Sequence, residues 1–106
     1  MKSITDKAEV SIDFPEKTYM GSFGRDSEFS AERDETGVLL KIVRRGEERR
    51  RVEVHLHYYL FAEILADIAS SLAGHPLDEA HRGPLEDAAN ALKRALAKGG
   101  GKRRSP

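Results

Sequence analysis

Apolar and polar residues alternate through the first half of the chain and then change to a helical spacing. Alternation with a period of two is typical of strands that have one buried face. It occurs in five segments, residues 10–14, 19–23, 29–33, 38–43 and 51–57. Turn-forming residues at 24–26 and 34–37 separate neighbouring segments. The pattern predicts a curved antiparallel sheet of four to five strands.

The fourth expected strand differs from the others because it is apolar on both faces near its start. Val38, Leu40 and Ile42 lie on one face, and Leu39 and Val43 lie on the other. Strands that are apolar on both sides are usually central in a sheet, or a partner covers them. We therefore expect this strand to be central, or to be covered by the partner in a dimer.

A helix is expected directly after the last strand. Its apolar residues fall at the spacing i, i+3, i+4, i+7 and i+11, which places them on one face: Phe61, Ile64, Leu65, Ile68 and Leu72. Gly74 is a candidate C-cap for this helix. We expect the long helix to lie across one face of the sheet and to bury its apolar stripe there.

A second helix is expected to begin near Pro84, because proline is favoured in the first turn of a helix. Glu86 and Asp87 lie near its start and basic residues lie near its end, which suits the helix dipole. Its apolar stripe is narrow and rich in alanine: Leu85, Ala88, Ala89, Leu92 and Leu96. Such a helix packs either within the chain or against a dimer partner. Residues 99–106 are expected to form a flexible basic tail, which leaves a single α+β domain over residues 1–98.

Composition excludes several classes of protein. The chain has 106 residues, 18 basic and 18 acidic, and no cysteine, so disulfides and thiolate metal sites are excluded. The balanced charge produces no overall field that favours nucleic acid or membrane. Glu63 and Asp67 interrupt the longest apolar run, and the N-terminal segment lacks the apolar core of a signal peptide. We therefore expect a cytoplasmic protein that does not contact a membrane.

No catalytic motif is present in the sequence. Glu28, Glu32 and Glu53 can share a sheet face, but their spacing does not indicate a paired acid and base in a cleft. His55 and His57 are two residues apart on a strand, so both imidazole rings lie on one face. Zinc needs further ligands that this spacing does not supply. The sequence thus predicts a non-enzymatic protein that uses no cofactor and no metal.

The run RRGEERRR between the last two expected strands is the strongest local chemical feature. Arginine side chains at a hairpin tip supply long, permanently charged forks that bind phosphates in bidentate geometry. The other explanation is that a turn exposed to water must be polar, and that these charges serve solvation alone. Composition leaves both explanations open.

Residues 28–72 as a whole resemble one repeat of the PUR-alpha family, which shares four antiparallel strands and a following helix with the PC4 and Whirly proteins. In that family an aromatic and acidic strand turns through a glycine into a run like FLKI, and a basic hairpin, an aliphatic strand and a helix follow. The matching positions here are Phe29, Gly37, Leu39, Leu40, Lys41, Ile42, Val52, Val54, Phe61 and Leu65. The resemblance implies an intertwined homodimer that binds single-stranded DNA or RNA on its exposed sheet face and hairpins.

The candidate nucleic-acid contacts lie on the hairpin and the polar sheet face: Lys41, Arg44, Arg45, Arg49, Arg50, Arg51, His55 and His57. The leading hypothesis is therefore a small non-enzymatic homodimer that binds single-stranded nucleic acid. The alternative is a protein-interaction or regulatory module of the same architecture that does not bind nucleic acid. Glu28 and Glu32 favour this alternative, because the matching strand of the family is rich in lysine and carries a further aromatic residue.

Overall fold

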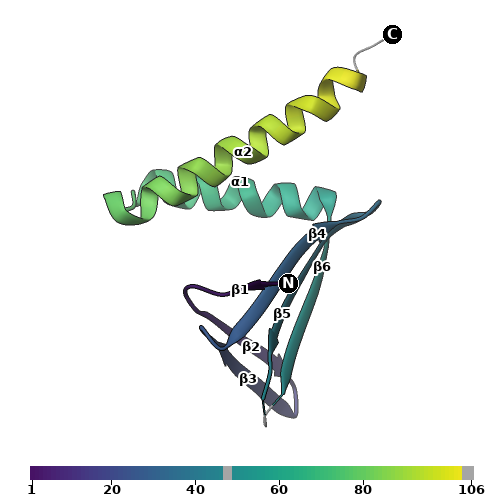
Figure 1. Cartoon of the computed structure of the whole chain (residues 1–106), viewed down its shortest axis with the longest axis vertical. Coiled ribbons are helices and arrows are strands. Elements are labelled where there is room, and N and C mark those ends of the chain that lie inside the picture. The colour runs from purple at the N-terminus through teal and green to yellow at the C-terminus, as the bar shows by residue number, and fades with distance from the viewer. Residues whose placement is uncertain (47–48, 104–106) are drawn as a thin grey trace. The chain divides into compact units, whose positions relative to one another are not determined.

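The structure, a computed structural model, describes residues 1–46 and 49–103, with side chains as far as residue 98. Strands come first in the chain and helices follow (Figure 1). The elements are β1 (Lys2–Ser3), β2 (Ala8–Phe14), β3 (Lys17–Phe23), β4 (Ser27–Arg33), β5 (Gly37–Arg44), β6 (Arg50–His57), α1 (Tyr58–Gly74) and α2 (Glu79–Arg103). This order confirms the predicted α+β class, with antiparallel strands followed by a long helix and a C-terminal helix.

The strands form two sheets. Sheet A has the order β1-β4-β5-β6, and β2 pairs only with β3 in a two-stranded ribbon, called the β2–β3 ribbon below. All pairs are antiparallel. The five predicted strand segments correspond to β2–β6, whereas β1 has two residues and is too short to show any alternation. β5 is central in sheet A, as its apolar character on both faces predicted.

The register of sheet A gives it one apolar and one polar face. Leu40 lies opposite Val54, and Ile42 lies opposite both Phe29 and Val52, so the apolar side chains of three strands share a face. On the other face the cross-strand pairs are Lys41 with Glu53, Val43 with Arg51, Leu39 with His55, and Glu28 with Val43. The alternation in the sequence thus fixes which side chains can form a polar surface.

The turn between β4 and β5 is held by the carboxylate of Asp34. Its Oδ1 accepts hydrogen bonds from the backbone N–H groups of Thr36 (2.8 Å) and Gly37 (2.9 Å). The backbone N–H of Asp34 in turn donates to the carbonyl of Gly37 (2.9 Å). An aspartate that bonds the backbone two and three residues ahead is a common way to close a turn. This turn therefore forms where the sequence predicted it.

The best buried side chains lie where β3 turns into β4. Phe23 and Ser27 are each 1% exposed. The backbone N–H of Ser27 donates to the carbonyl of Gly24 (2.9 Å) and so closes the turn. The carbonyl of Ser27 accepts a hydrogen bond from the backbone N–H of Ile4 (3.0 Å). Among the described residues, Phe23 is the only hydrophobic side chain that is fully buried. The core of this part of the chain is therefore small and sits at the base of the β2–β3 ribbon.

The chain divides into two compact units, Met1–Ala66 and Asp67–Pro106, and the boundary falls within α1. The prediction of one domain over residues 1–98 stays a prediction. No residue of α1 is fully buried, and Leu65 and Ile68 in its apolar stripe are 37% and 48% exposed. The predicted stripe is therefore only partly covered in the single chain. Neither described helix is long and apolar enough to cross a membrane.

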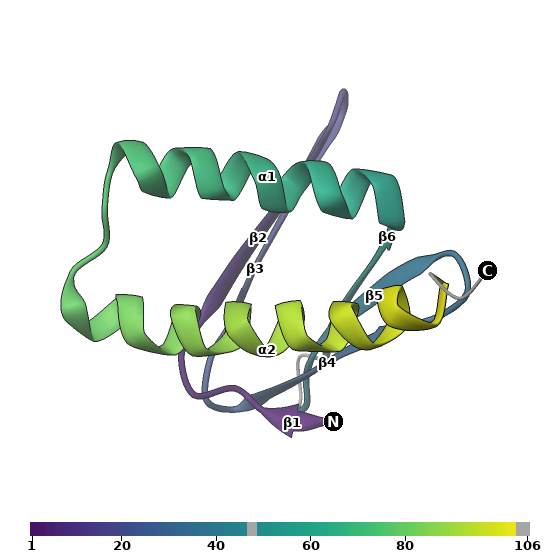
Figure 2. The same cartoon turned by 90° about the horizontal axis from the view of Figure 1, so that it is seen from above.

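Residues 75–78 join α1 to α2 (Figure 2). Gly74 is the last residue of α1 and does not take the left-handed conformation of a C-cap, since Gly46 is the only described glycine with a positive φ. The prediction of a C-cap at Gly74 is therefore wrong. The backbone N–H of His75 instead continues the helical pattern by donating to the carbonyl of Ser71 (3.0 Å).

α2 begins earlier than the sequence predicted. Asp78 caps the helix by accepting the backbone N–H of His81 on its Oδ1 (3.0 Å), so the helix starts at Glu79 and Pro84 lies inside it. This backbone bond is the largest cause of the lowered pKa of the Asp78 carboxyl. α2 continues through Arg103, and residues 104–106 lie outside the described residues. The expectation of a flexible tail over residues 99–106 stays a prediction.

Candidate nucleic-acid interface

Basic side chains surround a hollow at the end of sheet A where β5 and β6 are joined. Alternation along the two strands brings Lys41, Val43 and Arg51 to the polar face. The hollow has a volume of about 570 Å³ and is called the arginine hollow below. Its lining residues are Met1, Lys41, Val43, Arg45, Gly46, Arg49 and Arg51. Gly46 has a φ of 124°, a conformation that favours glycine, and it lets the hairpin turn at this point.

Carboxylates neutralise part of this positive charge. Glu53 contacts both Lys41 (Nζ to Oε1, 3.8 Å) and Arg51, and these two cations lower the pKa of the Glu53 carboxyl, Arg51 more strongly. Arg45 Nε lies 2.9 Å from Oε1 of Glu28. Within the described part of the chain, Arg49 makes no ion pair.

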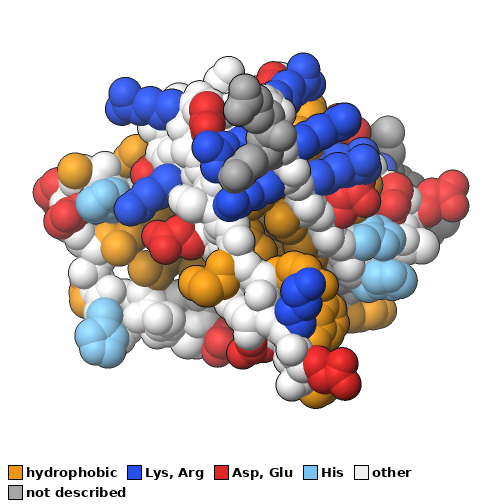
Figure 3. All heavy atoms as spheres, turned by 90° about the horizontal axis from the view of Figure 1, so that it is seen from below, with side chains coloured by type: hydrophobic (Ala, Val, Ile, Leu, Met, Phe, Trp, Pro, Cys, Tyr) orange, Lys and Arg blue, Asp and Glu red, His pale blue; other side chains and the backbone are white. Residues whose placement is uncertain are grey.

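The described side chains around the arginine hollow therefore comprise four cations and two carboxylates, an excess of two positive charges. Glu47 and Glu48 of the same hairpin lie outside the described residues. Lys and Arg side chains gather on one side of this end of the molecule (Figure 3). The described side chains alone thus give this end a locally positive surface on a chain without net charge.

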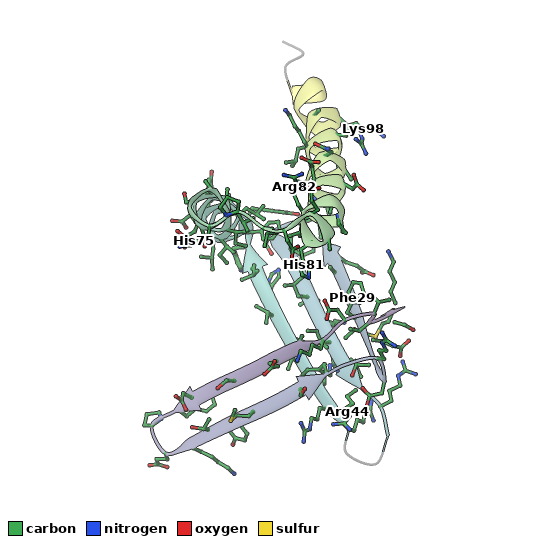
Figure 4. The ribbon with its side chains drawn as sticks, turned by 90° about the vertical axis from the view of Figure 1, so that its left-hand side faces the viewer. Phe29, Arg44, His75, His81, Arg82 and Lys98 are labelled. Atoms are coloured by element: carbon green, nitrogen blue, oxygen red, sulfur yellow. The ribbon has the colours of Figure 1, made fainter. Side chains whose placement is uncertain are left out.

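Two of the predicted contact residues lie on the other face of sheet A. Arg44 and Arg50 are cross-strand partners on the apolar face, beyond Ile42 and Val52. Arg44 Nε donates to Oδ2 of Asp26 (3.0 Å) at the end of sheet A (Figure 4). The Ser27 hydroxyl, and then Arg44, lower the pKa of this Asp26 carboxyl. The sequence thus predicted one arginine cluster, and the structure divides it between two faces.

Arg50 lies beside the β2–β3 ribbon. Its guanidinium lines two hollows with Val10, Met20 and Gly21 of the ribbon. The guanidinium lies close to Gly21, since a Cβ at this position would be 3.7 Å from an Arg50 nitrogen, an ordinary van der Waals contact. Arg50 is therefore not among the residues that line the arginine hollow.

The two histidines lie on the polar face at the opposite end of the strands. His55 Nε2 is 3.1 Å from Oδ2 of Asp34, and the ring centroids of His55 and His57 are 4.9 Å apart. The register places both beside the turn between β4 and β5, away from Arg51. No group of three or more metal-binding side chains occurs among the described residues. The histidines therefore form a separate polar cluster with Asp34, and they do not extend the arginine hollow.

The sequence did not reveal a second hydrogen-bonded chain at this turn. Arg33 Nε donates to the hydroxyl of Tyr58 (2.9 Å), and this hydroxyl donates to the backbone carbonyl of Asp34 (2.6 Å). The hydrogen bond that Arg33 donates to Tyr58 is the largest cause of the raised pKa of Arg33. These bonds connect Tyr58, the first residue of α1, to the turn. They could not be predicted from the sequence, because residues so far apart in the chain meet only through the geometry of the turn.

Acid should weaken the turn through Asp34. Its pKa is lowered from 3.8 to about 2, first by the backbone N–H of Thr36 and then by that of Gly37. A lowered native pKa stabilises the fold above the unfolded pKa, and this contribution is lost as the pH falls toward about 2. We expect Asp34→Asn to flatten the fall of the melting temperature over this acid range, measured by circular dichroism at a series of pH values. Identical pH profiles for both proteins would contradict the assignment.

No family model, no curated protein and no solved structure matches this chain. The resemblance to the PUR-alpha repeat therefore stays a prediction from the residues. The class that the fold defines is an α+β chain whose four-stranded sheet carries a basic hollow at one end of its polar face.

Proposed function

We propose that the chain is a small non-enzymatic protein that acts as a homodimer and binds single-stranded nucleic acid at the arginine hollow. The observation that carries this proposal is the convergence of Lys41, Arg45, Arg49 and Arg51 around one open hollow. Guanidinium groups keep their charge at any physiological pH and match the geometry of phosphate oxygens. A flexible strand can bring successive phosphates to such a surface, and each contact releases condensed counterions.

The chemistry of the surface also sets the kind of binding. Among the described residues, the polar face of sheet A carries no Phe, Tyr or Trp side chain on which bases can stack. His55 and His57 are the only flat rings on that face, and Asp34 already engages His55. Binding by phosphate contacts alone depends strongly on salt and only weakly on base sequence. We therefore expect an affinity that is similar for oligonucleotides of different sequence.

The test is the salt dependence of binding to a labelled single-stranded oligothymidylate, followed by fluorescence anisotropy. Replacing Arg45 and Arg49 together by serine removes two phosphate contacts and should lower the slope of log affinity against log salt by about 1.4. The affinity should fall by about tenfold or more at low salt. The double variant Lys93→Ser with Arg94→Ser removes the same charge from α2 and serves as the matched control.

The outcomes separate the two functions. Equal losses in both double variants would show that net charge, and not the arginine hollow, attracts the oligonucleotide. Absence of binding by the unaltered protein at low salt would remove the nucleic-acid function altogether. The protein-interaction module without nucleic-acid binding would then take its place, and one observation favours it: Phe14, Tyr19 and Met20 are 57%, 50% and 76% exposed.

A further inference from the structure

The β2–β3 ribbon has one apolar and one polar face. Its register places the apolar residues on one face: Ala8, Val10, Ile12, Phe14, Tyr19 and Phe23. The other face is polar except at Met20, with Glu9 opposite Ser22 and Asp13 opposite Thr18. A ribbon that separates its side chains this sharply has a face that is suited to burial.

Burial along the apolar face falls steadily from the base of the ribbon to its tip. Phe23 at the base is 1% exposed, Ile12 is 43%, Tyr19 is 50% and Phe14 at the tip is 57% exposed. The ribbon extends beyond the strands of sheet A (Figure 4). A two-stranded ribbon in water is only marginally stable unless its apolar face is covered. The tip therefore needs a cover that sheet A of the same chain does not supply.

The two aromatic side chains of the exposed tip contact each other. The rings of Phe14 and Tyr19 pack edge to face, with centroids 6.0 Å apart and planes at 81°. The ammonium group of Lys17 lies 5.2 Å from the centroid of the Tyr19 ring. Such a pre-arranged aromatic pair loses little conformational entropy when a partner buries it. It has the character of an anchor for a protein interface.

The base of the ribbon offers a receptor for such an anchor. A hollow of about 390 Å³ opens beside it, with mostly apolar walls, and is called the ribbon hollow below. Its lining residues are Val10, Ile12, Tyr19, Met20, Gly21, Phe23, Arg50, Arg51 and Val52. This volume falls within the range of about 300–1,000 Å³ that accommodates small organic ligands, so an aromatic ring fits. Gly21 is part of the wall, and a Cβ there would make only ordinary contacts with Phe23 and Arg50, so a long side chain at this position is needed to fill the hollow.

The charges at the two ends of the ribbon are complementary. Asp13, Glu16 and Lys17 flank the tip, two carboxylates against one ammonium group, and Arg50 and Arg51 border the ribbon hollow. An apolar tip whose border has a net negative charge thus matches an apolar hollow with a basic border. Because one surface carries both halves, two copies related by a twofold axis satisfy both matches at once.

We propose that the apolar face of the β2–β3 ribbon is the contact between two copies of this chain. Phe14 and Tyr19 of each copy occupy the ribbon hollow of the other, beside Gly21, Phe23 and Val52. This inference rests on the homodimer of the proposed function and identifies its interface. It does not use Arg45 or Arg49, so the two ideas can fail separately.

The absence of cysteine from the chain permits a direct test by disulfide trapping. The single variants Phe14→Cys and Val52→Cys are mixed in equal amounts and oxidised mildly. A disulfide forms only when the two Cα atoms come within about 7 Å. We expect the mixed dimer, with one chain of each variant, to be the main crosslinked product on a non-reducing gel with mass spectrometry. Ser11→Cys, on the polar face of the ribbon, replaces Phe14→Cys in the matched control and should give little product.

Analytical ultracentrifugation of the full chain gives the second readout. The unaltered protein should sediment as a dimer at micromolar concentration. Phe14→Glu should raise the dimer dissociation constant by at least about tenfold through charge at the centre of the interface, and Gly21→Leu should do the same by filling the ribbon hollow. Ser11→Glu adds the same charge to the polar face and should leave the dimer intact. Circular dichroism verifies that each variant keeps its fold.

Three results would overturn the inference. One is a monomeric unaltered protein, and another is a dimer that both Phe14→Glu and Gly21→Leu leave intact. The third is efficient crosslinking within one chain of the double variant Phe14→Cys with Val52→Cys, which would mean that the chain covers its own ribbon. A monomer that still binds the oligothymidylate would refute the ribbon contact and leave the phosphate-binding surface of the proposed function standing.

Discussion

Replacing Gly37 by alanine is expected to destabilise the protein by about 3 kcal/mol, the upper end of the usual cost of overpacking. Gly37 is the first residue of β5 and lies opposite His57 of β6. A Cβ at this position would clash with the carbonyl oxygen of Leu56 and would lie 2.8 Å from the Cα of His57. These neighbours are backbone atoms of the adjacent strand, so no side-chain rotation relieves the contact.

A movement of the backbone at Gly37 cannot easily relieve this clash, because Gly37 is held in the turn by two hydrogen bonds. Gly37 donates its backbone N–H to Asp34 Oδ1 (2.9 Å) and accepts from the backbone N–H of Asp34 (2.9 Å). Moving Gly37 away from β6 would therefore strain the turn that joins β4 to β5. Urea denaturation followed by circular dichroism, at a fixed protein concentration, gives the change in the free energy of unfolding.

Gly74→Ala is the matched control for this substitution. Gly74 is the last residue of α1, and a Cβ there would meet no atom within 4 Å. Alanine is a better helix former than glycine, so this change should be neutral or should stabilise by up to about 1 kcal/mol. A loss below about 1 kcal/mol for Gly37→Ala would mean that β5 and β6 do not approach each other as closely as described.

The two faces of β6 were predictable because this strand follows the period of two without interruption. Val52, Val54 and Leu56 lie on one face and Arg51 and the histidines on the other, as the alternation indicated. Such a pattern strongly restricts how the strand can pair with its neighbour, since a register shift of one residue would move every apolar side chain to the polar face. The central place of β5 followed from a different pattern, since its apolar side chains lie on both faces.

The division of the strands into two sheets was not predictable in this way. Alternation tells which residues of a strand share a face, but not which strand becomes its neighbour. β1 pairs with β4 through Lys2 opposite Phe29 and Ser3 opposite Glu28, a contact between segments with no shared pattern. The separation of the β2–β3 ribbon likewise depends on tertiary packing around Phe23.

The basic site was predictable in composition but not in geometry. Arginines next to one another in a strand point to opposite faces, so Arg50 and Arg51 had to separate once β6 included both. The sequence nevertheless suggested one cluster, because the length of the hairpin loop was unknown. The same uncertainty about element ends placed the start of α2 at Pro84, whereas the cap at Asp78 sets it earlier.

Replacing Phe23 by alanine is expected to cost about 3–5 kcal/mol of unfolding free energy, the range for deleting a fully buried phenylalanine. Phe23 is 1% exposed and lies at the junction of the β2–β3 ribbon with the turn into β4. It also lines the ribbon hollow, so its loss would enlarge that hollow and loosen the base of the ribbon. The cost should appear in the midpoint of urea denaturation and as faster amide hydrogen exchange along β2 and β3.

Phe23→Leu is the matched control, because leucine keeps most of the apolar volume and should cost less than about 1.5 kcal/mol. The comparison separates loss of packing from loss of the aromatic ring itself. If alanine and leucine cost the same small amount, below about 1 kcal/mol, the base of the ribbon is not a core and Phe23 lies in contact with water. If alanine costs the full amount while sheet A keeps slow exchange, the ribbon unfolds as its own unit. That result would support the proposal that a second copy covers its tip, where Phe14 remains 57% exposed.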